Sequence, residues 1–450
     1  MRRLPTNLVG DAYTSTRHWE LLETLVDLDD RMPGQEGERV GAELVRDAFE
    51  EHGLCDVTID EFEIAGWWRG TSSLAVEHDR PHTFEGQHEI VALPGTPGET
   101  IASELVDVGH GLPSDFEAAD LEGKIAMASS ATPETEDRWI HRAEKYYAAA
   151  NHGAAGFVFR NHVEGCLPPT GSIGREDGPG PIPAVGVSKE VGDRLVRYSA
   201  DRSLEATLAA DARNEPATSR NVEGVLGPDT DEEVILTAHV DAHDVGEGAN
   251  DNGVGTVLVA EVARLLARIE DDLETAVRFV VFGSEEIGLY GSSHWVDTHP
   301  NEQVKALVNL DSAGYSRNLK VYTHRFGAIG EAFEEAAEEL AVPVEVYDAI
   351  KPHSDHWPFA QEGIPAAEGQ AVKEESGRGW GHTHADTLDK LDVRDLRDLS
   401  VVLASAILKL AAADRPIEHK SREAIREATI EDGYGEGMRK RGAWPFEDLE

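Results

Sequence analysis

The sequence contains little cysteine and no long run of apolar residues. Only two of its 450 residues are cysteines, Cys55 and Cys166, and they form no CxxC pair. Neither a disulfide framework nor a thiolate metal site is indicated, so we interpret both cysteines as reduced thiols. The most apolar stretch, Val401 to Ala413, is interrupted by Lys409 and is too short to span a bilayer. Because no apolar run of signal-peptide length follows the amino terminus, we expect a soluble, cytoplasmic protein.

Positive charge is also scarce. The chain has 41 lysine and arginine residues against 86 aspartate and glutamate residues, which gives a formal net charge of −45. Such a charge disfavours binding to nucleic acid or to an anionic membrane, so we expect neither as a partner. The acidic residues are spread along the whole chain, and 30 arginines outnumber 11 lysines. Because salt at about 1 M screens repulsion over a few ångströms, this composition indicates a salt-rich cytoplasm, as in haloarchaea.

Two apolar segments are each followed at once by side chains that can bind metal. Residues 234–238 precede His239, and residues 277–282 precede the pair Glu285 and Glu286. The segment between them has the apolar spacing of an amphipathic helix, so together they predict a parallel strand, helix and strand unit. In open α/β sheets, active-site groups gather at the carboxyl ends of the strands. We therefore expect the histidine and the glutamates to lie together.

The remaining sequence predicts one large domain with an insert. Between about residues 90 and 212 the chain changes to short strands broken by glycine and proline, which indicates a small unit with its own core. We divide the chain into an amino-terminal part of the main domain (1–90), the insert (91–212), the main domain (213–415) and a charged carboxyl-terminal tail (416–450). We expect a turn at residues 66–68, and a glycine-rich stretch at residues 433–437 followed by a loose acidic terminus.

Five side chains near the predicted strand ends are candidate metal ligands: His239, Asp251, Glu286, Asp311 and His382. Imidazole and carboxylate without thiolate suit zinc, with cobalt or manganese as substitutes. Five ligands are too many for one tetrahedral ion but fit two ions that share a bridging carboxylate, for which Asp251 is the candidate. Two ions about 3.5–4 Å apart can lower the pKa of a water between them and polarise a carbonyl, which suits amide hydrolysis.

Two further carboxylates have predicted catalytic roles. Consecutive side chains leaving a strand point in opposite directions, so Glu286 can bind metal while Glu285 faces the substrate as general base. It would take a proton from water and return it to the leaving amine. Asp241, two residues after His239, lies on the same side of the strand and could fix the tautomer of that imidazole.

Several motifs resemble the co-catalytic zinc peptidases of clan MH, which include bacterial leucyl aminopeptidases and plasma glutamate carboxypeptidase. They are His239-x-Asp241, Asn250-Asp251-Asn252-Gly253, Ser284-Glu285-Glu286-x-Gly288, Asn309-Leu310-Asp311, Ser354-Asp355-His356 and His382-Thr383-x-x-Asp386-Thr387. The resemblance extends to about residue 413. It implies an α/β fold, with a three-layer α/β/α domain on a mixed, mostly parallel central sheet. It also implies that the insert is a small β-rich protease-associated (PA) domain.

The resemblance further implies how two zinc ions are held. One ion would be bound by His239, Asp251 and Asp311, and the other by Asp251, Glu286 and His382, with Glu285 as the base. His384 stands where the family often has proline and is a rival to His382 as the ligand. The frame His-Thr-x-x-Asp-Thr favours His382. Asp386 in that frame is interpreted as structural.

Three functions are compatible with these residues. The leading hypothesis is an aminopeptidase acting on peptide substrates, as a monomer or homodimer. A carboxypeptidase would need a cation for the terminal carboxylate of the substrate, for which Arg378 is the candidate. A non-catalytic binding protein is the third hypothesis, and the complete set of ligands and base argues against it. The aromatic residues Trp357, Phe359 and Trp380 flank the motifs and form either an apolar substrate pocket or part of the core.

We predict that transfer to low salt inactivates or unfolds the protein. At about 10 mM salt the screening length reaches about 30 Å, so repulsion among the excess carboxylates acts across the whole fold. Peptidase activity and circular dichroism, measured before and after dilution from about 1 M salt, test this expectation. Full activity in the dilute buffer would contradict the halophilic interpretation.

Overall fold

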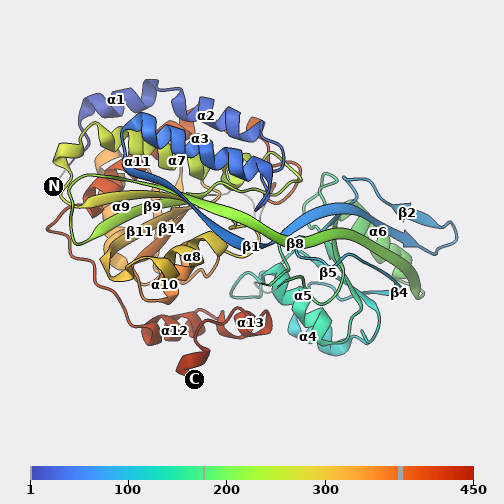
Figure 1. Ribbon diagram of the computed structural model, residues 1–450. Coiled ribbons are helices and arrows are strands. Elements are labelled where there is room, and N and C mark those ends of the chain that lie inside the picture. The colour runs from blue at the N-terminus through green and yellow to red at the C-terminus, as the bar shows by residue number, and fades with distance from the viewer. Residues whose placement is uncertain (1–2, 176–177, 373–378) are drawn as a thin grey trace.

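Two long antiparallel strands, β1 (Cys55–Val76) and β8 (Leu204–Leu226), run from one lobe of the molecule into the other (Figure 1). This computed structural model describes residues 3–175, 178–372 and 379–450. The first lobe contains the chain before β1 and most of the chain after β8, whereas the second lobe contains the segment between these two strands. The strand pair therefore connects the two lobes.

The turn expected at residues 66–68 is wrong, because β1 continues through them. Trp67 pairs with Asn214 of β8 and is buried. A Cβ atom at Gly66 would lie 2.6 Å from the Cβ of Ala217, which is closer than two such atoms can pack. Gly66 thus permits a close approach of the two strands, which is a common reason for glycine inside a strand.

The first lobe is a three-layer α/β/α domain on a mixed, mostly parallel sheet, which confirms the expected fold class. Its strands lie in the order β13, β12, β14, β11, β9, β10 and β8. Strands β14, β11, β9 and β10 are parallel neighbours, and β12 is parallel to β13. Strand β12 is antiparallel to β14, and β8 is antiparallel to β10. The bounds are β9 (Glu233–His239), β10 (Ala276–Phe282), β11 (Val304–Leu310), β12 (Leu319–Tyr322), β13 (Val344–Tyr347) and β14 (Ala366–Ala371). Residues 234–238 of β9 are all buried, as expected for a central strand covered on both faces.

Helices cover both faces of this sheet (Figure 1). Helices α2, α3, α7 and α11 pack together on one face, and α8 and α10 lie on the other. The helices of this lobe are α1 (Thr6–Thr14), α2 (Arg17–Val26), α3 (Glu36–His52), α7 (Val254–Ala267), α8 (Tyr290–Thr298), α9 (Gly327–Leu340), α10 (Trp357–Gln361) and α11 (Val393–Leu410). Within the described ranges, no helix has the length and apolar character needed to cross a bilayer.

The second lobe continues the sheet beyond β8. Its strands follow in the order β4, β5, β6, β7 and β3, and β2 pairs with β1. The bounds are β2 (His82–Phe84), β3 (Ile90–Ala92), β4 (Glu99–Asp107), β5 (Ile125–Ser129), β6 (Gly156–Arg160), β7 (Ala184–Val187), α4 (Pro113–Ala118), α5 (Arg142–Asn151) and α6 (Lys189–Ser199). Two apolar clusters, separate from the core of the first lobe, fill this unit.

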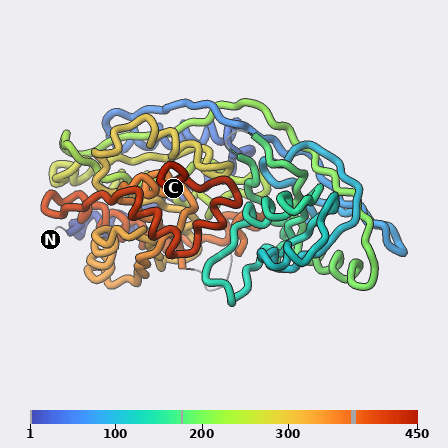
Figure 2. The backbone as a smooth tube through the Cα atoms, turned by 90° about the horizontal axis from the view of Figure 1, so that it is seen from below, coloured from blue at the N-terminus to red at the C-terminus, as the bar shows by residue number. Residues whose placement is uncertain are grey.

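The carboxyl-terminal tail contacts both lobes. It forms α12 (Arg422–Glu431), which packs against α10, and α13 (Gly435–Lys440), which packs against α5 of the second lobe (Figures 1 and 2). Between the two helices, Asp432 accepts hydrogen bonds from the backbone N–H of Ile350 at 2.7 Å and from Arg325 at 2.8 Å. The expectation of a loose acidic terminus is wrong, because α13 begins within the glycine-rich residues 433–437 and Trp444 and Phe446 after it are buried.

Candidate metal centre

The ends of three adjacent parallel strands bring most of the candidate ligands together. Strand β9 lies between β10 and β11 and is parallel to both. His239 is the last residue of β9, Glu285 and Glu286 follow β10, and Asp311 follows β11. Because adjacent parallel strands end at the same edge of a sheet, these side chains lie near one another there.

Two groups of potential ligand atoms lie at this edge. His239, Glu285 and Asp311 each offer one atom within 4.8 Å of the other two. His243, Glu286 and His382 form a second such group. Asp251 lies between the two groups, in the segment η1 (Ala249–Gly253) that leads into α7, and its own backbone angles are not helical. Its Oδ1 is 3.6 Å from Nε2 of His239, and its Oδ2 is 3.2 Å from Nε2 of His382.

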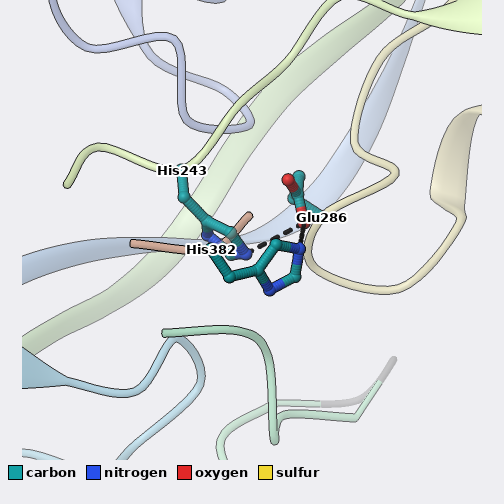
Figure 3. A group of neighbouring side chains, drawn as sticks. All are labelled: His243, Glu286 and His382. Carbon is teal, nitrogen blue, oxygen red and sulfur yellow. Dashed lines mark ion pairs between the residues drawn. The ribbon is translucent and has the colours of Figure 1, made fainter. Parts of the chain in front are cut away.

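The second group includes a histidine that our sequence reasoning missed (Figure 3). Oε2 of Glu286 lies 2.9 Å from Nε2 of His243 and 3.1 Å from Nε2 of His382. His243 comes four residues after His239, in the loop that follows β9. The sequence signal for this residue was a further histidine in the loop between the His239-x-Asp241 motif and the Asn250-Asp251-Asn252-Gly253 motif. A cavity of about 10 Å³, lined among others by these three side chains and Asp251, lies at this point.

The residues present fit zinc. His239 Nε2, His243 Nε2 and Glu286 Oε1 are buried and make no hydrogen bond with acceptable geometry to any residue that the structure describes. Buried polar atoms are usually paired, so unsatisfied nitrogen and oxygen atoms in both groups of potential ligands indicate bound cations. Imidazole and carboxylate are also the donors that zinc takes when thiolate is absent.

The pKa shifts of the candidate ligands also favour a bound divalent cation. Burial raises the pKa of Glu285 well above its ordinary value, and the nearby charges of Glu286 and Asp311 add to this rise although His239 opposes it. Burial likewise raises the pKa of Glu286. Burial alone would lower the pKa of His239, but the neighbouring carboxylates outweigh this effect and raise it. An excess of desolvated carboxylates is a state that a divalent cation stabilises.

Two buried carboxylates hold the ligand loops in place. Asp241 accepts hydrogen bonds from the backbone N–H groups of Glu285 at 3.1 Å and Glu286 at 3.0 Å. Asp386 accepts them from Asn250 at 2.9 Å and Asp251 at 3.0 Å. The Asp241 side chain also lies 3.5 Å from Nδ1 of His239, but the backbone oxygen of Asp241 is nearer to that nitrogen, at 3.1 Å. Asp241 therefore positions the glutamate pair as well as the histidine.

Backbone carbonyl groups select the metal-binding nitrogen of two histidines. A carbonyl oxygen can only accept, so the Asp241 oxygen requires the proton of His239 on Nδ1. Nδ1 of His382 lies 3.3 Å from the backbone oxygen of Thr170 in the second lobe, and Thr170 N–H donates to the His382 oxygen at 2.9 Å. In both rings Nε2 is then the nitrogen that can bind a metal. The insert thus contributes to the orientation of a candidate ligand.

Arg31 is a further positioning residue, and our sequence reasoning did not identify it. Its buried guanidinium donates to the backbone oxygens of Val240 at 3.2 Å, Glu247 at 3.1 Å and Gly248 at 3.2 Å. Burial lowers the pKa of Arg31 to about 10, which leaves it protonated near neutral pH. No local pattern around residue 31 indicates this role, because these three partners lie more than 200 positions away in the sequence.

The other residues named from the sequence lie in different surroundings. Nε2 of His384 faces Nδ1 of His88 at 3.2 Å, not the ligand groups. Trp357 and Phe359 are buried in the core of the first lobe, whereas Trp380 is 40% exposed. These aromatics were expected to form either a substrate pocket or part of the core, and Trp357 and Phe359 are part of the core. Arg378 lies outside the described residues.

Comparison with known proteins identifies the family. The profile of peptidase family M28 matches residues 221–407, and that of the PA domain matches residues 91–195. Aminopeptidase YwaD of Bacillus subtilis is 30% identical over 405 residues, which cover 86% of this chain and 82% of that protein. The chain belongs to peptidase family M28.

Two further relatives of this M28 peptidase are informative. The structure of BSAP, described as a zinc aminopeptidase from Bacillus subtilis, is 27% identical and has a TM-score of 0.68, covering 90% of this chain and 96% of that one. Carboxypeptidase Q of Mus musculus is 24% identical over 431 residues, which cover 91% of this chain and 88% of that protein. The expected zinc-peptidase architecture with a PA insert is thereby confirmed.

We predict that Asp241→Asn lowers activity or zinc affinity by about 10- to 100-fold, the usual effect of removing a partner that orients ligands. The two backbone N–H groups bond to different oxygens of the carboxylate, and the amide replaces one of these oxygens with an NH2 donor, so one N–H group loses its acceptor. Initial hydrolysis rates and zinc content by atomic emission spectroscopy measure the effect. Asp47→Asn, on the exposed face of α3, is the matched control. Equal rates and zinc content in both variants would contradict a positioning role for Asp241.

Proposed function

We propose that this M28 peptidase is a di-zinc aminopeptidase. The observation that carries the proposal is the pair of ligand groups linked by Asp251 at the ends of β9, β10 and β11. In this assignment one zinc is held by His239, Asp251 and Asp311, and the other by Asp251, Glu286 and His382. The assignment of His382, and not His384, is supported by the contact of His384 with His88.

Glu285 is the proposed general base. It lies beside His239 and Asp311, whereas the next residue, Glu286, lies beside His382. The two glutamates therefore serve different groups, as the opposite directions of consecutive side chains suggest. When bound, zinc supplies a Lewis acid that polarises a carbonyl and lowers the pKa of water. Glu285 accepts the proton of the attacking water and returns it to the leaving amine.

Aminopeptidase activity is favoured because YwaD and BSAP are both described as aminopeptidases and both match over most of the chain. A carboxypeptidase is the second candidate, since carboxypeptidase Q matches 91% of this chain. That activity needs a cation for the terminal carboxylate of the substrate. Arg175 is a described cation that lines a cavity of about 370 Å³ between the lobes, together with Trp67, Ile287 and Tyr290.

The domain boundaries and the salt-rich setting expected from the sequence are also part of this proposal. We place the boundaries of the PA insert at residues 91–212, of the catalytic domain at 1–90 and 213–415, and of the tail at 416–450. The separate apolar clusters of the two lobes support this division. We also propose that the enzyme works in the salt-rich cytoplasm of a halophile, on the basis of its net charge of −45.

An aminopeptidase requires a free amine on its substrate, so we predict cleavage of leucyl, glutamyl or lysyl amides and no cleavage of their N-acetylated forms. Prolonged treatment with a chelator should abolish the activity, and added zinc should restore it. Release of the amine product, followed in high salt, is the measurement. A matched pair of dipeptides with free or amidated carboxyl ends serves as control. Preference for acetylated substrates with a free carboxyl end would favour the carboxypeptidase.

The glutamate pair provides a sharper test. Glu285→Gln keeps the size of the side chain but cannot accept a proton, so it should retain zinc and lose about 10²- to 10⁴-fold in turnover. Glu286→Gln should instead lower zinc content, because a neutral amide is a poorer ligand than a carboxylate. Metal content and turnover are measured on both variants. Loss of zinc in Glu285→Gln alone would reverse the two roles, and unchanged turnover in both would refute the active site.

A further inference from the structure

His243 occupies a position that the assigned zinc ligands do not account for. Its ring is buried, with 4% of the side chain exposed, and Nε2 points at the same Glu286 oxygen as Nε2 of His382 (Figure 3). The rings of His243 and His382 meet edge to face, with centroids 4.2 Å apart and an interplanar angle of 77°. Two imidazole nitrogens and a carboxylate oxygen thus converge on one point.

The surroundings of His243 offer its ring no other polar role. Nε2 lies 2.9 Å from Oε2 of Glu286 without hydrogen-bond geometry, and neither ring nitrogen makes a hydrogen bond to any part of the chain that the structure describes. A histidine packed only for its shape would leave two buried polar atoms unsatisfied, which costs free energy. His243 also lines the small cavity that Asp251, Glu286 and His382 share. Both facts are explained if a cation lies between these side chains.

We propose that His243 is a further zinc ligand. Together with Asp251, Glu286 and His382 it gives one zinc ion four protein ligands, all from the group on that side of Asp251. This inference rests on the proposed di-zinc function and adds a ligand to it. The four side chains come from the loop after β9, the turn before α7, the end of β10 and the loop before α11.

The two zinc sites then differ in their number of protein ligands. Sites with four protein ligands are typical of closed, structural zinc, whereas sites with three keep a position open for water or substrate. The group of His239, Asp251 and Asp311 offers three protein ligands and so would keep a position open. The site that contains His243 should therefore retain its zinc more strongly, and the other site should lose its zinc first when a chelator is added.

The inference is tested by counting imidazole ligands in the full chain loaded with Co²⁺. Each ligating ring gives one exchangeable N–H proton signal that the paramagnetic ion shifts far outside the usual range. The native chain should give three such signals, from His239, His243 and His382, and His243→Phe should give two. The exposed His88 provides the matched control, because His88→Phe should keep all three. Two signals in the native chain, with no loss in His243→Phe, would overturn the proposal.

Zinc retention gives a second measurement, independent of spectroscopy and of catalysis. His243→Gln keeps a donor that can reach Glu286 but is a poor zinc ligand. We expect this variant to release its second zinc at a chelator concentration about 10- to 100-fold lower than the native chain does. Release at the native concentration would show that His243 only donates a hydrogen bond to Glu286.

The two proposals fail in different ways. If the di-zinc function is wrong, the native chain will bind no zinc in stoichiometric amount and will not cleave amides. If only the role of His243 is wrong, the native chain will bind two zinc ions and cleave amides, but His243→Gln will retain both ions as the native chain does. Circular dichroism in high salt verifies that both His243 variants are folded.

Discussion

The mutual repulsion of buried carboxylates at the ends of β9, β10 and β11 is the constraint on which the rest of the site depends. Glu285 and Glu286 lie in surroundings that disfavour their charged forms, and each belongs to a group of candidate ligands that also contains histidine. Such a cluster is stable only when cations offset it. Histidine rings supply part of the compensation, and their unsatisfied nitrogens indicate that a metal supplies the rest.

Around this cluster, hydrogen bonds hold the loops that carry the candidate ligands. Asp241 and Asp386 each accept two backbone N–H groups, and Arg31 donates to three backbone oxygens of the loop that carries His243. Thr170, from the PA insert, orients His382. The PA insert is thus part of the frame of the centre, and the tail, which packs on α10 and α5, joins the two lobes a second time.

Much of the fold and part of the site could be predicted from the sequence because the relevant cues are local. Apolar runs of strand length predicted β9 and β10 within one residue at each end, and the polar groups after them predicted where the site lies. Local cues failed at residues 66–68 and near the carboxyl terminus, where glycines permit close packing of neighbouring elements. Gly66 allows close strand pairing, and the glycines near residue 435 allow a short helix to pack against the insert.

The sequence by itself determined the α/β alternation, the strand ends that carry His239 and the glutamate pair, and the strongly acidic surface, because each follows from the order and chemistry of neighbouring residues. Only the tertiary structure decided that His243 joins Glu286 and His382, that Arg31 holds a loop more than 200 positions away, and that His384 turns to His88. These relations depend on how the chain returns to the same point in space. The spacing of residues in the sequence does not show which distant residues become neighbours, because the packing of strands and helices that are far apart in the chain decides this.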